Sequence, residues 1–149
     1  MRIDKILADK KKYLNLLLLA DEQESMIDKY LDRGDMFVMF NTENKPICSA
    51  VITDEENGTC ELKNLAVATE FQRQGYGKKM IDFLSRLYSE RFKYMIVGTG
   101  DSIQTVSFYK HCGFHYSHVV SDFFTLNYDH PIIEDGKVLK DMIYFSKIL

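Results

Sequence analysis

The residues with the clearest chemical meaning are the segment from Gln72 to Gly77, which reads Gln-Arg-Gln-Gly-Tyr-Gly. Gly75 lets the backbone come close to a ligand, and Gly77 lets the start of a helix pack tightly against a neighbour. Successive backbone N–H groups at a helix N-terminus bind anions such as phosphate or pyrophosphate. The segment therefore predicts a phosphate-binding loop that opens a helix.

Two other phosphate motifs are excluded by single residues. A P-loop would need glycine where Gln72 stands, and the run Gly77-Lys78-Lys79 lacks the hydroxyl that would bind Mg²⁺. The pair Gly98-Thr99-Gly100 lacks the third glycine of a dinucleotide-binding fingerprint, because Ile103 occupies its place. These exclusions leave a phosphate site that serves neither a magnesium nucleotide nor a nicotinamide cofactor.

The composition predicts one globular domain over residues 1–149. The chain has 149 residues, 46% of them hydrophobic and 28% charged. This is enough apolar material for a core whose burial offsets the conformational entropy that the chain loses on folding. The formal net charge of −3 argues against a nucleic-acid partner, which would require a clustered basic excess. The one basic run, Lys10–Lys12, fits the solvated face of a helix.

Membrane and export signals are missing from the sequence. The longest apolar run, Leu16–Ala20, is far shorter than the roughly 20 residues that span a bilayer. Cys48, Cys60 and Cys112 leave one thiol unpaired in any matching and form no CxxC pair, which implies a reducing compartment. We expect a cytoplasmic protein with no membrane partner and no zinc site. A homodimer is compatible with the sequence.

The elements that must position the loop follow from hydrophobic spacing, and alternating strands and helices in the middle of the chain predict an α/β fold. The expected helices are Ile6–Leu18, Ser25–Gly34, Gly75–Arg91 and Ser102–Cys112. The expected strands are Met36–Phe40, Ile47–Thr53, Thr59–Ala68, Tyr94–Gly98, Phe114–Thr125 and Val138–Ile148.

Together with the loop, three further blocks resemble the GNAT superfamily of acetyl-CoA-dependent N-acetyltransferases. The blocks are Glu61–Val67, Gly98–Ser102 and Phe108–Phe114. The segments Asp122-Phe123-Phe124, His130-Pro131-Ile132 and Asp141-Met142 extend the likeness to a bacterial subgroup of that family. Asp101 departs from the subgroup, which usually has asparagine there. We expect an acid at this place to change how tightly the pantetheine or phosphate is bound.

The resemblance implies a mixed central sheet flanked by helices, with the fourth and fifth strands splayed apart at a bulge. In the family the pantetheine of acetyl-CoA pairs with the backbone of the fourth strand, and a strand N–H polarises the thioester carbonyl. Leu65 is the residue implied for that N–H, unless the segment is an ordinary buried strand. The implied cofactor-binding residues are Leu65, Ala66, Val67, Gln72, Arg73, Gln74, Gly75, Tyr76, Gly77, Lys78, Asp101, Ser102 and Tyr109.

The resemblance also implies two catalytic side chains. An amine with a pKa near about 10.4 needs a base before it can attack a thioester. Glu61 stands where several family members place that carboxylate, which acts through water, and Tyr109 stands where the family protonates the leaving thiolate. A merely solvated or salt-bridged Glu61, and a Tyr109 that only packs in the core, remain open alternatives.

Histidine and cysteine chemistry is not favoured. His111, His115 and His118 have metal-ligand spacing, but Gly113 marks a break between helix and strand, so they would not share one face. The cysteines have no neighbouring base that would support an acyl-enzyme. We therefore expect no metal and no covalent intermediate.

We expect the acceptor site in the segment 122–141. Asp122, Glu134 and Asp135 are its candidate substrate residues, because carboxylates outnumber cations there and would attract a cationic amine. The alternative is a polar turn around Gly136 that faces water. Phe123, Phe124 and Tyr128 would supply an apolar wall.

The sequence thus predicts transfer of an acetyl group from acetyl-CoA to a primary amine by direct attack in a ternary complex. The acceptor is a small-molecule or peptide amine. A non-catalytic acyl-CoA-binding or protein-interaction module of the same fold is the alternative.

Overall fold

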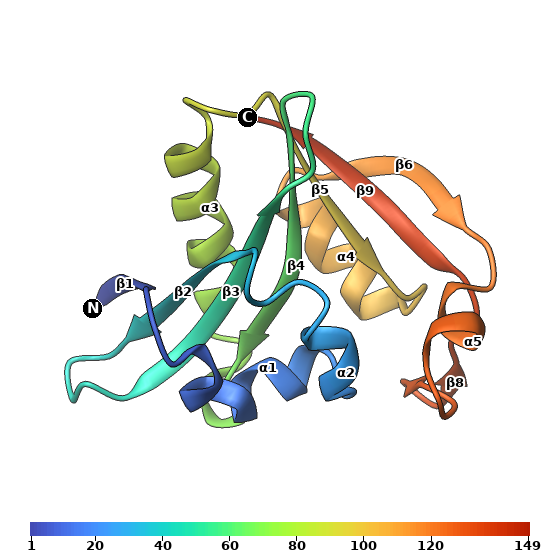
Figure 1. The fold of residues 1–149 in the computed structure, drawn as a ribbon, viewed down its shortest axis with the longest axis horizontal. Helices are drawn as coiled ribbons and strands as arrows, with labels where there is room; N and C mark the ends of the chain where they lie inside the picture. Colours follow the sequence, from blue (N-terminus) through green and yellow to red (C-terminus); the bar gives the residue numbers. More distant parts are fainter.

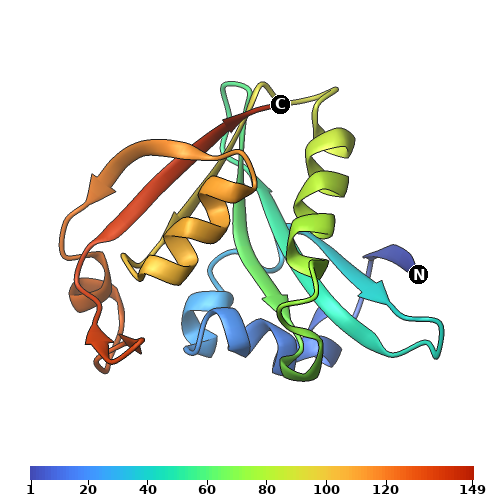
Figure 2. The same ribbon diagram turned by 180° about the vertical axis from the view of Figure 1, so that it is seen from behind.

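The structure is a computed structural model that describes residues 1–149 (Figures 1 and 2). The strands are β1 (Arg2–Ile6), β2 (Asp35–Phe40), β3 (Pro46–Asp54), β4 (Thr59–Val67), β5 (Tyr94–Thr99), β6 (His115–Val120), β7 (Ile133–Glu134), β8 (Lys137–Val138) and β9 (Met142–Ile148). The helices are η1 (Lys10–Tyr13), α1 (Leu14–Ala20), α2 (Glu24–Ile27), η2 (Thr69–Phe71), α3 (Tyr76–Tyr88), α4 (Ile103–His111) and α5 (Phe123–Asn127).

Seven strands form one mixed sheet in the order β1-β2-β3-β4-β5-β9-β6. All neighbours pair antiparallel except β4 and β5, which are parallel. A separate two-stranded hairpin joins β7 to β8. The mixed sheet and its covering helices confirm the α/β fold predicted from the sequence.

Both faces of the sheet are covered, and strand alternation divides the core into two clusters. Phe37 and Met39 of β2 pack toward α3 and α4, whereas Met36 and Val38 pack toward the chain around α1 and α2. Helix α3 presents one apolar stripe, with Gly77, Met80, Ile81, Leu84 and Tyr88 buried at helical spacing. None of the helices has the length and apolar character needed to cross a membrane.

Strands β4 and β5 separate after a short parallel contact, as Figures 1 and 2 show. They pair from Thr59 only as far as Glu61, although β4 continues to Val67. On the other edge of β4, the register with β3 shifts so that Lys63 is an extra residue, which is a β-bulge. The gap between β4 and β5 beyond Glu61, called the splay below, is therefore present as the resemblance implied.

The prediction of a helix from Ile6 is wrong at its beginning. Residues Arg2–Ile6 form the edge strand β1, paired with β2, and Asp9 adopts a left-handed conformation (φ 54°) before helical structure begins at Lys10. The second helix is shorter than predicted, because α2 ends at Ile27 and turns lead from there to Gly34.

Two predicted strands near the C-terminus are also shorter than expected. Asp122 adopts a left-handed conformation (φ 59°), so the strand that begins at His115 stops at Val120 and α5 follows. Val138 belongs to the small hairpin, and β9 begins only at Met142, where it inserts between β5 and β6. Helix α5 and the β7–β8 hairpin therefore occupy the segment in which the sequence pattern predicted the ends of two longer strands.

Candidate active site

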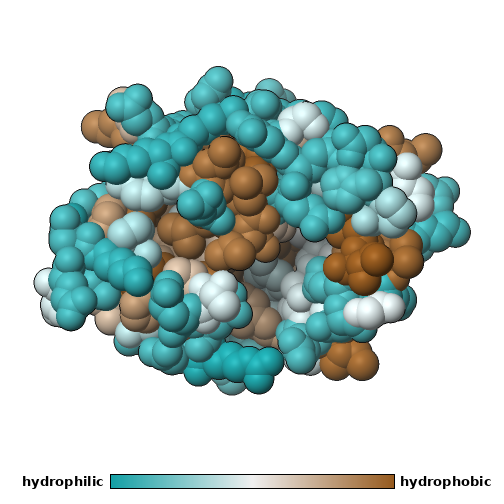
Figure 3. All heavy atoms as spheres, turned by 90° about the horizontal axis from the view of Figure 1, so that it is seen from below, coloured by the Kyte–Doolittle hydropathy of each residue, from teal (hydrophilic) through white to brown (hydrophobic).

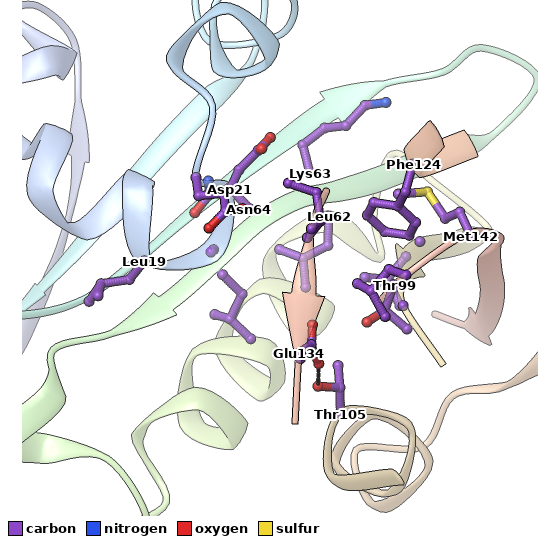
Figure 4. A pocket seen from close by; sticks show the side chains of 18 of the residues that line it. Leu19, Asp21, Leu62, Lys63, Asn64, Thr99, Thr105, Phe124, Glu134 and Met142 are labelled. Atoms are coloured by element: carbon purple, nitrogen blue, oxygen red, sulfur yellow. Dashed lines mark hydrogen bonds between the residues drawn. The ribbon is translucent and has the colours of Figure 1, made fainter. Parts of the chain in front are cut away.

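A cavity of about 430 Å³ lies in the splay. Figure 3 shows this underside of the molecule hollowed and bordered by hydrophobic side chains, and Figure 4 shows the cavity from close by. Its walls come from the end of α1, from β4, from the end of β5, from α4 and from the segment between α5 and β9. The lining residues used below are Asp21, Glu22, Lys63, Asn64, Leu65, Thr105, Tyr109, Phe124, Tyr128 and Glu134.

The cavity wall made by β4 is one free strand edge. Leu65, Ala66 and Val67 pair with β3, but they lie beyond the last residue that pairs with β5. Main-chain groups on that edge have no neighbouring strand, so apart from the Val67 carbonyl, which accepts from Gln72, they are available to an extended ligand that lies along β4. The main-chain roles of the three residues stay predictions.

The predicted phosphate loop follows β4 through η2 and is fixed to the protein by its glutamines. Gln72 Nε2 donates to the Val67 carbonyl at 3.0 Å, and Gln74 Nε2 donates to the Glu70 carbonyl at 3.3 Å. Arg73 takes a left-handed conformation at φ 62°. The glutamine side chains thus stabilise the loop by bonding to main-chain carbonyls of the protein.

The loop ends at the N-terminus of α3, which no side chain caps. The Lys79 N–H donates to the Gly75 carbonyl, so helix geometry leaves the N–H groups of Tyr76, Gly77 and Lys78 without an intrahelical acceptor. Gly75 itself has φ 87°, a conformation that favours glycine. The loop therefore offers an anion site built from the main chain.

Neighbouring contacts set the direction of α3 at that site. A Cβ on Gly77 would stand 3.0 Å from the Phe108 ring, so a larger residue would require that ring of α4 to shift. Lys78 forms an ion pair with Asp82 at 2.8 Å, one turn along α3. Tyr76 packs edge-on against Phe71 with ring centroids 6.3 Å apart.

Tyr109 points into the cavity region from α4 and is 9% exposed. Its ring packs edge-on against Phe108 and Phe114, with centroid distances of 5.1 and 5.7 Å. Burial raises the pKa of the Tyr109 phenol above its ordinary value. The hydroxyl therefore remains protonated at neutral pH and retains a proton to donate.

Glu61 is buried on β4 but does not line the cavity. Its Oε2 lies 3.2 Å from Lys63 Nζ and accepts a hydrogen bond from the Tyr144 hydroxyl at 3.4 Å. Burial raises the pKa of the Glu61 carboxyl, against the opposing effect of Lys63. A carboxylate in this place reaches the cavity only through water or through Lys63.

Asp101 and Ser102 lie between β5 and α4. Ser102 is the N-cap of α4, where its hydroxyl accepts from the Thr105 N–H at 3.3 Å. Asp101 forms a 2.6 Å ion pair with Lys137 of the small hairpin. The negative charge of Asp101, where the resembled subgroup usually has asparagine, is thus matched by a lysine.

Of the three candidate acceptor residues, only Glu134 lines the cavity, where its Oε1 accepts from the Thr105 hydroxyl at 2.6 Å (Figure 4). Asp122 lies 3.5 Å from Lys140 in an ion pair. Asp135 occupies the exposed turn of the small hairpin at φ 52°. The last two carboxylates lie outside the cavity lining.

Asp21 lies at the end of α1 and lines the cavity, and it was not predicted from the sequence. Its carboxylate accepts hydrogen bonds from the hydroxyls of Tyr30, at 3.1 Å, and Tyr128, at 2.7 Å. Burial raises the pKa of the Asp21 carboxyl, while the two phenols act in the opposite direction. No local pattern marks Asp21, because one of its partners is 107 residues away.

Thiol and metal chemistry find no support in the structure. All three cysteines are buried and free, and burial raises the pKa of both Cys48 and Cys60 to about 12. Such thiols are protonated at neutral pH and are poor nucleophiles. No group of three or more His, Cys, Asp or Glu side chains is arranged to hold a metal ion.

Comparison with known proteins places this geometry in a family. Residues 32–116 match the family described as acetyltransferase (GNAT) domain. The chain is 31% identical over 131 residues to YvbK of Bacillus subtilis, described as an uncharacterized N-acetyltransferase, and the match covers 87% of this chain and 84% of that protein.

Two solved structures share the whole fold. One is a GNAT family acetyltransferase from Elizabethkingia anophelis with acetyl-CoA bound, at 32% identity and a TM-score of 0.94, covering 99% of this chain and 97% of that one. The other is a Bacillus subtilis acetyltransferase in complex with CoA, at 30% identity and a TM-score of 0.89, covering 99% and 98%. The chain belongs to the GNAT family of acetyltransferases.

Proposed function

We propose that residues 1–149 form one N-acetyltransferase domain that transfers an acetyl group from acetyl-CoA to a primary amine by direct attack in a ternary complex. The observation that carries this proposal is the free edge of β4, which leads from the cavity to the uncapped N-terminus of α3. Tyr109 stands at the cavity beside that edge. The alternative of a non-catalytic binding module has no observation in its favour.

Acetyl-CoA would lie along the splay. Its pyrophosphate would accept from the N–H groups between Arg73 and Lys78, because an uncapped helix N-terminus offers converging donors. The pantetheine would pair with the free edge of β4 from Leu65 to Val67. Asp101 and Ser102 would border the cofactor from the start of α4, with the Asp101 charge balanced by Lys137.

The transfer itself needs an oxyanion donor and a proton donor. The amine nitrogen attacks the thioester carbon, and the Leu65 N–H stabilises the oxyanion, a role typically worth about 2.7–4 kcal/mol per donor. Collapse of the tetrahedral intermediate breaks the C–S bond. The Tyr109 hydroxyl then protonates the departing thiolate, and solvent returns a proton to the phenolate.

Glu61 would remove the proton from the amine through an intervening water. Its position outside the cavity excludes direct contact with an amine that lies there, and its raised pKa brings the carboxylate closer to the range of a useful base. The buried, protonated thiols of the cysteines support direct attack over an acyl-enzyme.

The acceptor would be a small-molecule or peptide amine that enters beside Glu134. Asp122 and Asp135 would act on it from outside the lining, by drawing a cationic amine toward the opening rather than by contact.

Release of free coenzyme A thiol, measured across a panel of primary amines, tests the proposal. We expect thiol release that depends on the amine, together with a mass increase of one acetyl group on the amine. Binding of acetyl-CoA without thiol release for any amine would contradict it and favour the non-catalytic module.

A further inference from the structure

Asp21 is a carboxylate held rigidly at the cavity without a cation. Each of its oxygens accepts from one phenol, Oδ2 from Tyr30 at 3.1 Å and Oδ1 from Tyr128 at 2.7 Å. No lysine, arginine or histidine forms an ion pair with it. The Gln23 backbone N–H also acts on the carboxylate, and because a carboxylate has about four lone-pair sites, at least one remains for a ligand.

The charges around the cavity do not compensate Asp21. Glu22 and Glu134 also line it, and the one lysine in the lining, Lys63, is paired with Glu61 at 3.2 Å. Glu22 is an exposed partner of His130, and Glu134 accepts from the neutral Thr105 hydroxyl. The cavity therefore has an excess of negative charge that the protein itself does not balance.

Asn64 supplies a second acceptor in the same wall, as Figure 4 shows. Its Nδ2 donates to the Leu17 carbonyl at 3.0 Å and to the Tyr30 hydroxyl at 3.1 Å, so the amide orientation is fixed. Asn64 is 3% exposed, and its Oδ1 is buried with no hydrogen-bond partner. A buried acceptor without a donor is costly, and a ligand donor would relieve that cost.

An apolar wall stands beside these acceptors. Phe124 and Tyr128 stack with centroids 5.7 Å apart and an interplanar angle of 24°, and both line the cavity. The same Tyr128 hydroxyl that binds Asp21 thus borders a surface suited to an alkyl chain. The arrangement fits a group with several N–H donors, a positive charge and an apolar stem.

We propose that Asp21 determines acceptor specificity by binding a second ammonium group of the acceptor, so that the preferred substrate class is a short diamine or a similar dication. This proposal rests on the proposed function. One nitrogen of the acceptor reaches the thioester near Leu65 and Tyr109, and the other donates to Asp21. Asp21 is a positioning residue in this account, and Tyr30 and Tyr128 hold its carboxylate in place.

Direct binding tests the proposal without turnover. Calorimetry would compare 1,4-diaminobutane with butylamine on protein saturated with coenzyme A, in the wild type and in Asp21→Asn, which preserves shape and removes the charge. We expect the variant to bind the diamine about tenfold more weakly or worse, the scale of a lost charge-assisted hydrogen bond. Butylamine, which has a single ammonium group, should lose less affinity than the diamine.

Asp129→Asn is the matched control, because it removes a nearby exposed carboxylate that lies outside the cavity lining. It should leave the diamine preference intact. Equal affinity of wild type for both amines, or a preference that survives Asp21→Asn, would overturn the proposal. If Asp21→Asn fails to fold, Tyr128→Phe takes its place, because it removes the 2.7 Å hydrogen bond that orients the Asp21 carboxylate and should weaken diamine binding more than butylamine binding.

The two proposals fail separately. Diamine binding that depends on Asp21, without acetylation of any amine, would overturn the proposed function and leave only the ammonium-binding site at Asp21 standing. Acetylation of both amines with equal kcat/KM in wild type and in Asp21→Asn would do the reverse.

Discussion

The proposed cofactor end and the proposed acceptor end of the site use different kinds of binding groups. At the proposed cofactor end the candidate binding groups belong to the main chain, namely the edge of β4 and the start of α3, and Gln72 and Lys78 are occupied with internal contacts. At the other end the polar groups are side chains, chiefly Asp21 and Glu134.

This difference suits one end to a ligand that is always the same and the other end to selection among acceptors. Main-chain dipoles are present whatever the side chains are, so they suit a ligand that never changes. Charged side chains can be exchanged singly, so they suit selection of an acceptor. Substitutions at the cofactor end should act on every amine alike, and substitutions at the acceptor end should act on some amines only.

The largest effect is expected from Tyr109→Phe, which removes the proton for the thiolate. We expect kcat to fall by about 10²–10⁴-fold for all amines, because general acid catalysis contributes on that scale. Acetyl-CoA affinity should hardly change, since the proton is needed only in the transition state. Steady-state kinetics and calorimetry check both points. Tyr116→Phe, at a tyrosine that is 62% exposed, is the control, and full activity in Tyr109→Phe would return that residue to core packing.

Glu61→Gln should lower the rate by about a hundredfold, toward the low end of general base catalysis. In the wild type the carboxylate becomes available only as pH rises through its raised pKa, so the rate should rise with pH there. The amide cannot ionise, so this limb of the profile should disappear. A pH–rate profile measured with one amine shows whether it does. An unaltered profile would assign the base to water or to an amine that is already neutral.

Gly75→Val should weaken acetyl-CoA binding by about tenfold, from the strain of a positive φ, about 1–3 kcal/mol, and from the space that the pyrophosphate needs. No atom lies within 4 Å of the added Cβ, so the fold should survive. Gly136→Val is the control, because Gly136 has φ 74° and equally open surroundings in the small hairpin. Calorimetry that finds the same acetyl-CoA affinity in both variants would remove the pyrophosphate from this loop.

The smallest effects concern the C-terminal carboxylates. Glu134→Gln should raise the KM of a cationic amine by about fivefold, equivalent to about 1 kcal/mol, and leave the acetyl-CoA KM unchanged. Asp122→Asn and Asp135→Asn should change only the salt dependence, because both lie outside the lining. Kinetics at low and high salt distinguish them. Loss of acetyl-CoA affinity in Glu134→Gln would contradict the assignment of Glu134 to the acceptor end alone.

Local sequence patterns could predict the cofactor end because its signals are contiguous. The residues from Gln72 to Gly77 lie together in the chain. Glycine at positions 75 and 77 indicates a positive φ and close packing, and both are present there. Strand β4 could be predicted from its own apolar residues, and the splay followed from the family resemblance.

The acceptor end could not be predicted in the same way. The carboxylate of Asp21 is held by hydrogen bonds from Tyr30 and Tyr128, and Tyr128 is 107 residues away in the chain. Strand β1 was not predicted, and its last residue, Ile6, was taken as the start of a helix because it fits helical spacing toward Tyr13, whereas pairing with β2 makes it a strand residue. Left-handed residues such as Asp122 end elements where hydrophobic spacing alone continues them.

The central claim is direct attack by the amine on acetyl-CoA while both occupy the cavity. Initial rates measured over a grid of acetyl-CoA and amine concentrations test it most directly. The account predicts double-reciprocal lines that intersect, as a ternary complex requires. Parallel lines, together with an acetylated protein trapped when the amine is omitted, would show a covalent intermediate and contradict it.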